Sequence, residues 1–117
     1  MQRRKFIMAL GGDERAAELA AKPRLYIAPV GAGMNAHALR LAAELRKHGV
    51  VCELGDESFR LKKSFETAER LGIQRVVIIG ENEVASGAYS VKDLTRGEQV
   101  TMKADELAGM GDLPGGD

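Results

Sequence analysis

The sequence predicts an α/β protein, in which helices cover both faces of a mixed five-stranded sheet in a three-layer α/β/α arrangement. Over residues 25–79, short apolar runs alternate with helical patterns, which indicates crossover connections and parallel strands. Beyond residue 88, two alternating segments flank a turn, which indicates an antiparallel hairpin. A chain of 117 residues suits one domain, and a 44% hydrophobic composition indicates a folded one. We therefore expect three parallel strands, a hairpin at one side of them, and three helices.

The first strand and helix follow from residues 25–49. Leu25–Val30 is a short apolar run that suits a buried strand, and Gly31–Gly33 makes a tight turn after it. Apolar residues then recur at helical spacing, at Met34, Ala38, Leu41 and Leu45. Gly49 lies where a left-handed helix cap is expected, and Val50–Leu54 is the second strand.

The second helix and third strand repeat this order. Leu61, Phe65, Ala68 and Leu71 share one helical face, and Gly72 follows as a cap. Arg75–Ile79 is almost wholly β-branched and predicts the third strand, which ends in an acidic loop.

The rest of the core domain is the hairpin and a closing helix. Tyr89 and Val91 alternate with polar residues, residues 93–97 form the turn, and a second alternation contains Val100 and Met102. A short helix is expected at residues 104–110. We expect residues 24–110 to form the domain, with 1–23 as a linker or appended helix and 111–117 as a flexible tail.

Composition limits the function classes. The formal net charge is zero, which argues against a non-specific grip on long nucleic acid such as DNA but permits a small basic patch. Cys52, the one cysteine, is expected to be a buried small residue rather than a reactive thiol. The sequence has no apolar window of membrane-spanning length and no secretory signal, so we expect a cytoplasmic protein.

Several site types are disfavoured. Gly31–Gly33 lies between a strand and a helix, but the full dinucleotide spacing fails and a plain turn is the better interpretation. His37 and His48 lie eleven positions apart on one helix, too far to share a metal ion. The chain shows no obvious nucleophile and base, so we predict no catalytic residue and no cofactor here.

A cationic cluster precedes and opens the second helix, formed by Arg60, Lys62 and Lys63. A helix N-terminus normally favours acids, because its exposed amides carry partial positive charge. Cations and amides together would attract an anionic ligand. The alternative is a solvated basic face.

Acidic residues follow the third strand at its carboxyl end, the edge where α/β sheets tend to hold ligands. Here Glu81 and Glu83 offer carboxylates that accept hydrogen bonds from base amino groups. Lys92, on the hairpin, is a candidate to contact a base, a phosphate or Glu83. The alternative is a surface salt bridge, which contributes about 0–1 kcal/mol.

Three linked motifs closely resemble the anticodon-binding domain at the C-terminus of histidyl-tRNA synthetases. Leu61–Phe65 with Ala68 and Leu71–Gly72 resembles the family's second-helix signature. Ile78–Glu83 resembles its strand-to-loop signature, and Val91–Leu94 with Gly97–Gln99 resembles its hairpin. The likeness covers roughly residues 24–110.

The resemblance implies an RNA-reading module that docks on the anticodon stem-loop of tRNA(His). It implies that Glu83 reads an anticodon base, that Lys92 faces the anticodon, and that Ser58, Arg60 and Lys63 face the same loop. The family's catalytic domain, which uses ATP and Mg and often works as a homodimer, is missing from this chain. Two alternatives remain: a regulatory or protein-interaction module without tRNA binding, and a flavodoxin-like nucleotide-binding module that relies on Gly31–Gly33.

Overall fold

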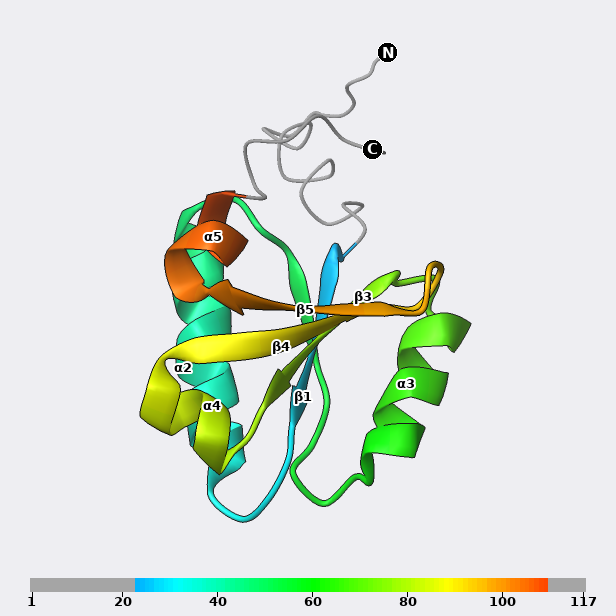
Figure 1. Cartoon of the computed structure of the whole chain (residues 1–117), viewed down its shortest axis with the longest axis horizontal. Coiled ribbons are helices and arrows are strands. Elements are labelled where there is room, and N and C mark those ends of the chain that lie inside the picture. The colour runs from blue at the N-terminus through cyan, green and yellow to red at the C-terminus, as the bar shows by residue number, and fades with distance from the viewer. Residues whose placement is uncertain (1–22, 110–117) are drawn as a thin grey trace, which may run out of the picture.

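The computed structural model describes residues 23–109, which form a mixed sheet of five strands with four helices (Figure 1). In chain order the elements are β1 (Leu25–Pro29), α2 (Met34–Lys47), β2 (Cys52–Leu54), α3 (Leu61–Arg70), β3 (Arg75–Ile79), α4 (Glu81–Ser86), β4 (Ala88–Asp93), β5 (Glu98–Lys103) and α5 (Ala104–Ala108). The predicted α/β class and the mixed five-stranded sheet are confirmed.

The strand order is β2-β1-β3-β4-β5. β1 pairs in parallel with both β2 and β3, while β4 pairs antiparallel with β3 and with β5. The hairpin therefore lies at one side of the parallel strands, as predicted. Because the three parallel strands point the same way, the loops that follow them meet at one edge of the sheet.

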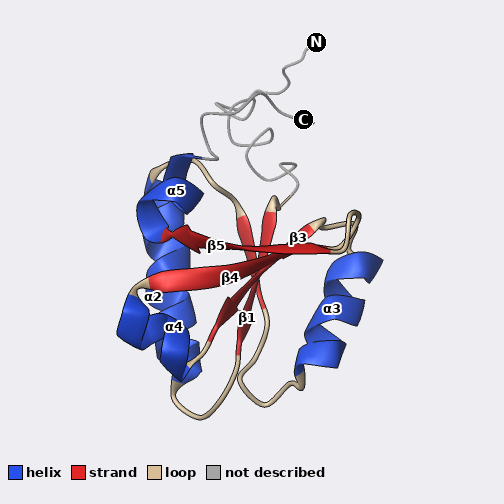
Figure 2. Cartoon of the chain, viewed as in Figure 1, coloured by secondary structure: helices blue, strands red, loops and turns tan. Residues whose placement is uncertain are grey.

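Helices cover both faces of the sheet, with α2 and α5 on one side and α3 on the other (Figure 2). A separate hydrophobic core lies on each face. On one face, α2 and α5 pack on side chains that include Leu25, Ile27 and Val77, all fully buried. On the other face, α3 contributes Ala68, which packs with Tyr26 and Val76. Strand alternation sends neighbouring residues to opposite faces, and this produces the three layers.

The acidic segment after β3 differs from the prediction. We expected a loop at Glu81 and Glu83, but this segment is the short helix α4. It forms because the Glu83 carboxylate accepts the backbone N–H of Gly80, and because Gly87 ends the helix at a φ of 75°. The described residues thus contain four helices, where three were expected.

The second strand is shorter than predicted, because it begins at Cys52 rather than Val50. The Val50 N–H donates to the Leu45 carbonyl at 3.0 Å, so this backbone group closes α2 instead of joining the sheet. The expected helix or linker at 1–23 lies almost wholly outside the described residues, as does the tail at 111–117.

Candidate nucleic-acid interface

An open hollow of about 470 Å³ lies at the start of α3. It is lined by the loop that joins β2 to α3 and by the first turns of α3. Three of the predicted site residues line it, namely Ser58, Arg60 and Lys63. All three side chains are exposed, and Lys62 adds a further cation to the same lining, which contains one carboxylate, that of Glu66. The structure therefore brings the cationic cluster of the sequence together around one concave surface.

The start of α3 adds to the positive potential of this hollow. Arg60 occupies the N-cap position, no side chain caps the helix, and its first turn contains no acidic residue. The exposed amides at a helix N-terminus carry partial positive charge, and here no carboxylate in the first turn opposes it. The hollow is suited to an anion such as a phosphate group.

Phe59 lies in the same hollow and was missed in the sequence analysis. The Lys63 ammonium lies 4.2 Å from the centroid of the Phe59 ring, which is a cation–π contact. Aromatic rings beside cations are the usual surface on which single-stranded nucleic acids stack their bases. The available signal was an aromatic residue directly between Ser58 and Arg60 in a basic segment.

Glu83 lies half-buried on α4, and both of its carboxylate oxygens have partners. Oε1 accepts the Gly80 N–H at 2.9 Å, and Oε2 accepts the Ser90 hydroxyl at 3.3 Å. Each carboxylate oxygen has two acceptor positions, so both retain capacity for a further donor. The structure thus fixes the orientation of this carboxylate at the end of the sheet.

Lys92 lies on the α3 side of the hairpin. It pairs in register with Val76, whose side chain belongs to the core under α3, so Lys92 faces the same way. Its ammonium lies 5.8 Å from the centroid of the Phe65 ring, on α3. No ion pair joins it to Glu83, so the salt bridge considered from the sequence does not form.

The predicted site residues fall into three groups. Ser58, Arg60 and Lys63 share the hollow, while Ser90 connects Glu83 to the strand that contains Lys92. Glu81 is exposed on the first turn of α4 and forms the third group by itself.

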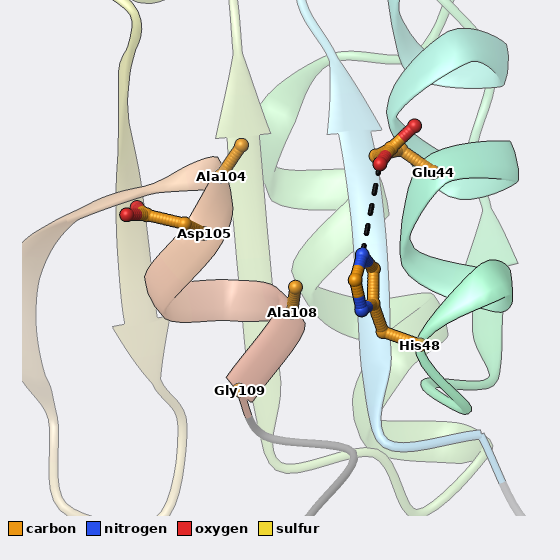
Figure 3. Close-up of a pocket in the computed structure, with 6 residues that line it drawn as sticks. All are labelled: Glu44, His48, Ala104, Asp105, Ala108 and Gly109. Carbon is orange, nitrogen blue, oxygen red and sulfur yellow. Dashed lines mark ion pairs between the residues drawn. The ribbon is translucent and has the colours of Figure 1, made fainter.

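A second hollow, of about 440 Å³, lies between the end of α2 and α5 (Figure 3). His48 and Glu44 line its α2 side and are joined by a 3.6 Å contact from Nε2 to Oε2. Ala104, Asp105 and Ala108 line the other side. Its lining contains two acidic residues and no lysine or arginine, and none of the predicted site residues lines it, so it is a poorer match to phosphate than the first hollow.

The Gly31–Gly33 turn also has an acidic neighbour. Gly31 and Gly33 have φ values of 106° and 85°, which glycine adopts without strain. The backbone N–H of Asn35, in the first turn of α2, donates to the Glu57 carboxylate at 2.9 Å. This amide at the start of α2 is therefore already bonded to a carboxylate, whose negative charge would repel a phosphate group, and this argues against the flavodoxin-like alternative.

Two features are absent from residues 23–109. No group of three or more histidine, cysteine, aspartate or glutamate side chains there is arranged to hold a metal ion. Within the same residues, no helix is both long and apolar enough to cross a membrane.

Comparison with known proteins agrees with this geometry. A family model described as an anticodon binding domain matches residues 24–110. A histidine–tRNA ligase from Koribacter versatilis is 52% identical, over 86% of this chain and 24% of its own length. A second one, from Solibacter usitatus, is 38% identical over 89% of this chain and 24% of its own length.

Among solved structures, histidyl-tRNA synthetase from Nostoc sp. PCC 7120 superposes with a TM-score of 0.71 at 30% identity. The superposition covers 77% of this chain and 22% of that protein. The chain thus spans about a quarter of the length of these relatives. It belongs to the anticodon-binding domain family, in the branch represented by the histidine–tRNA ligases.

Proposed function

We propose that this chain reads the anticodon arm of tRNA(His) for a histidine–tRNA ligase whose catalytic domain lies outside it. The RNA would dock on the side of the sheet that carries α3, against the hollow lined by Ser58, Arg60 and Lys63. The observation that carries this proposal is the hollow itself. It combines exposed cations, an uncapped helix N-terminus and an aromatic ring in one concave surface.

The roles within this surface follow from charge and chemistry. Arg60 and Lys63 would neutralise phosphates and fix the register of the loop without reading its sequence. Glu83 would accept a hydrogen bond from a base amino or imino group, because an ionised carboxylate presents acceptors only. Lys92 would hold the side of the loop next to the hairpin, and Glu81 would contribute a second acceptor at the end of the sheet.

The chemical steps of the reaction would take place elsewhere in the ligase. Activation of histidine with ATP and Mg²⁺ would belong to the catalytic domain, and a homodimer of the complete ligase would be the working assembly. Under this proposal the protein acts in the cytoplasm, where it supplies tRNA recognition and needs no cofactor of its own.

Chemical-shift mapping tests the docking surface directly. The chain is labelled with ¹⁵N and titrated with an RNA stem-loop that carries the tRNA(His) anticodon arm. We expect the largest amide shifts at residues 58–63, 81–83 and 90–92. The hollow between α2 and α5 serves as an internal control, through Glu44, His48 and Ala104. Shifts concentrated at that control surface, or no shifts at all, would overturn the proposal.

A further inference from the structure

Three hydrogen bonds join the first turn of α2 to the loop that precedes α3, across more than twenty residues of sequence. The Asn35 backbone N–H donates to Glu57 Oε1 at 2.9 Å. Asn35 Oδ1 accepts the Glu57 N–H at 2.8 Å, and Asn35 Nδ2 donates to Asp56 Oδ1 at 3.0 Å. Asn35 therefore uses its backbone and both ends of its side chain amide to hold this loop.

The same network continues to Ser58. The second carboxylate oxygen of Asp56, Oδ2, accepts the Ser58 N–H at 2.9 Å and the Ser58 hydroxyl at 2.6 Å. These bonds from Ser58, together with the bond from Asn35, hold the pKa of Asp56 below its usual range. Asp56 is therefore ionised at neutral pH and only accepts hydrogen bonds.

This arrangement determines what Ser58 presents to the hollow. Because its hydroxyl proton is directed to Asp56, the free lone pairs of Ser58 Oγ remain as acceptors. An acceptor at this position suits a donor on the RNA, either a ribose 2′-hydroxyl or a base N–H group. The neighbouring cations Arg60 and Lys63 would bind the phosphates.

We propose that Asn35 is a positioning residue for RNA binding, which acts through Asp56 to hold the Ser58 hydroxyl as an acceptor facing the hollow. The inference rests on the proposed function, because it assumes that RNA docks there. Asn35 itself lies on α2 and does not line that hollow. Its effect is therefore indirect and separable from that of the residues that touch the ligand.

Arg60 provides a contrast within the same loop. Its carbonyl accepts the N–H groups of Lys63 and Ser64, at 2.9 and 3.2 Å, so the first turn of α3 holds its backbone in place. Loss of the Asn35 network should thus disturb Ser58 more than Arg60. A general loss of stability would instead disturb Ser58 and Arg60 alike.

The test is a pair of double-mutant cycles, with affinity for the tRNA(His) anticodon stem-loop as the readout. We expect Asn35→Ala to weaken binding by on the order of 5-fold, as for one lost hydrogen bond. Ser58→Ala should weaken binding similarly, and the Asn35→Ala/Ser58→Ala double variant should lose little more than either single one. Asn35→Ala combined with Arg60→Ala should instead be additive.

A control variant, a second variant of Asn35 and a modified RNA complete the test. Gln74→Ala deletes an exposed side-chain amide just before β3, at the end of the sheet opposite to the loop that holds Ser58. This variant should bind RNA like the unmutated chain. If Asn35→Ala does not fold, Asn35→Asp keeps an acceptor for the Glu57 N–H. It replaces the donor to Asp56 with a carboxylate oxygen that repels it, and should also weaken binding. RNA with 2′-deoxy substitutions in the loop distinguishes the two possible donors to Ser58. These substitutions weaken binding if the donor is a ribose 2′-hydroxyl and leave the affinity unchanged if it is a base N–H group.

Binding by Asn35→Ala equal to that of the unmutated chain would overturn the inference while leaving the proposed function intact. Additive losses for Asn35 and Ser58, or no loss in Ser58→Ala, would also overturn it. Absence of RNA binding by the unmutated chain would instead remove the proposed function, and the role of Asn35 with it.

Discussion

The carboxylate of Glu83 accepts the backbone N–H of Gly80 at 2.9 Å, across the first turn of α4. The side chain that family resemblance assigns to base reading therefore also caps a helix. Gly80 suits this contact, because a Cβ there would lie 3.1 Å from Glu83 Oε1. Removal of Glu83 should thus affect both stability and RNA recognition, and the two effects have to be separated by the choice of variant.

Two substitutions at Glu83 separate them. Glu83→Ala removes the cap and the acceptor together. It should lower the free energy of unfolding by about 1 kcal/mol and weaken discrimination among anticodons more than total affinity. Glu83→Gln retains an oxygen for Gly80 and should keep the stability. It should lose discrimination, because an amide group donates where the carboxylate accepts.

Thermal melts and titrations with cognate and altered anticodon loops measure the two properties, and unchanged discrimination in Glu83→Gln would exclude a reading role.

Lys63 is expected to act through its charge. Lys63→Ala should reduce affinity for all stem-loops alike and lower the slope of log K against log salt by about 1, as for one lost phosphate contact. Lys47→Ala is the matched control. It removes an exposed lysine from the end of α2, beside Glu44 and away from the hollow. An equal change in the salt slope for both variants would mean that the hollow is not the phosphate contact.

Phe59 is expected to stack against a base. Phe59→Ala should weaken RNA binding by about 1–3 kcal/mol, the range for a base stacked on an aromatic ring. Phe59→Tyr keeps the ring and should bind nearly as well as the unmutated chain. Fluorescence anisotropy with a labelled stem-loop measures both affinities. A Phe59→Ala variant that binds normally would show that the ring only supports Lys63.

Cys52 is buried, as predicted, and burial raises the pKa of its thiol to about 11, although Arg46 opposes the shift. The reactive thiolate is therefore scarce near pH 8 in the folded protein, below the level in an unfolded chain. Reaction with a thiol reagent at pH 8 should be slow in buffer and fast in denaturant. Rapid labelling of the folded chain would contradict the buried position of β2.

The sequence was sufficient for the number and order of the strands and for the longer helices, because hydrophobic periodicity there is strong, although β2 is shorter than predicted. Arg75–Ile79 is the predicted third strand without change, and the second helix begins at Leu61 as expected. The α4 helix was missed because it buries no residue and shows no apolar face. Only the two ends of this helix are marked in the sequence. Glu83 accepts the Gly80 N–H at its start, and Gly87 adopts a left-handed backbone conformation at its end.

The candidate site was predictable in part for a similar reason. Charge clustering identified Arg60 and Lys63, since neighbours in a short segment remain neighbours in the fold. The network from Asn35 to Asp56 and Glu57 joins residues more than twenty positions apart, so no local pattern shows it. The place of Lys92 over Phe65 also depends on how α3 packs against the hairpin.

The most direct test of the account is a binding titration of this chain with the tRNA(His) anticodon stem-loop and a scrambled-anticodon control, at two salt concentrations. We expect tighter binding of the cognate loop at both concentrations, with both affinities falling as salt increases. Equal, salt-sensitive binding of the two loops would show a phosphate-binding surface without base reading. Absence of binding to either loop would contradict the central claim that this domain reads the anticodon arm.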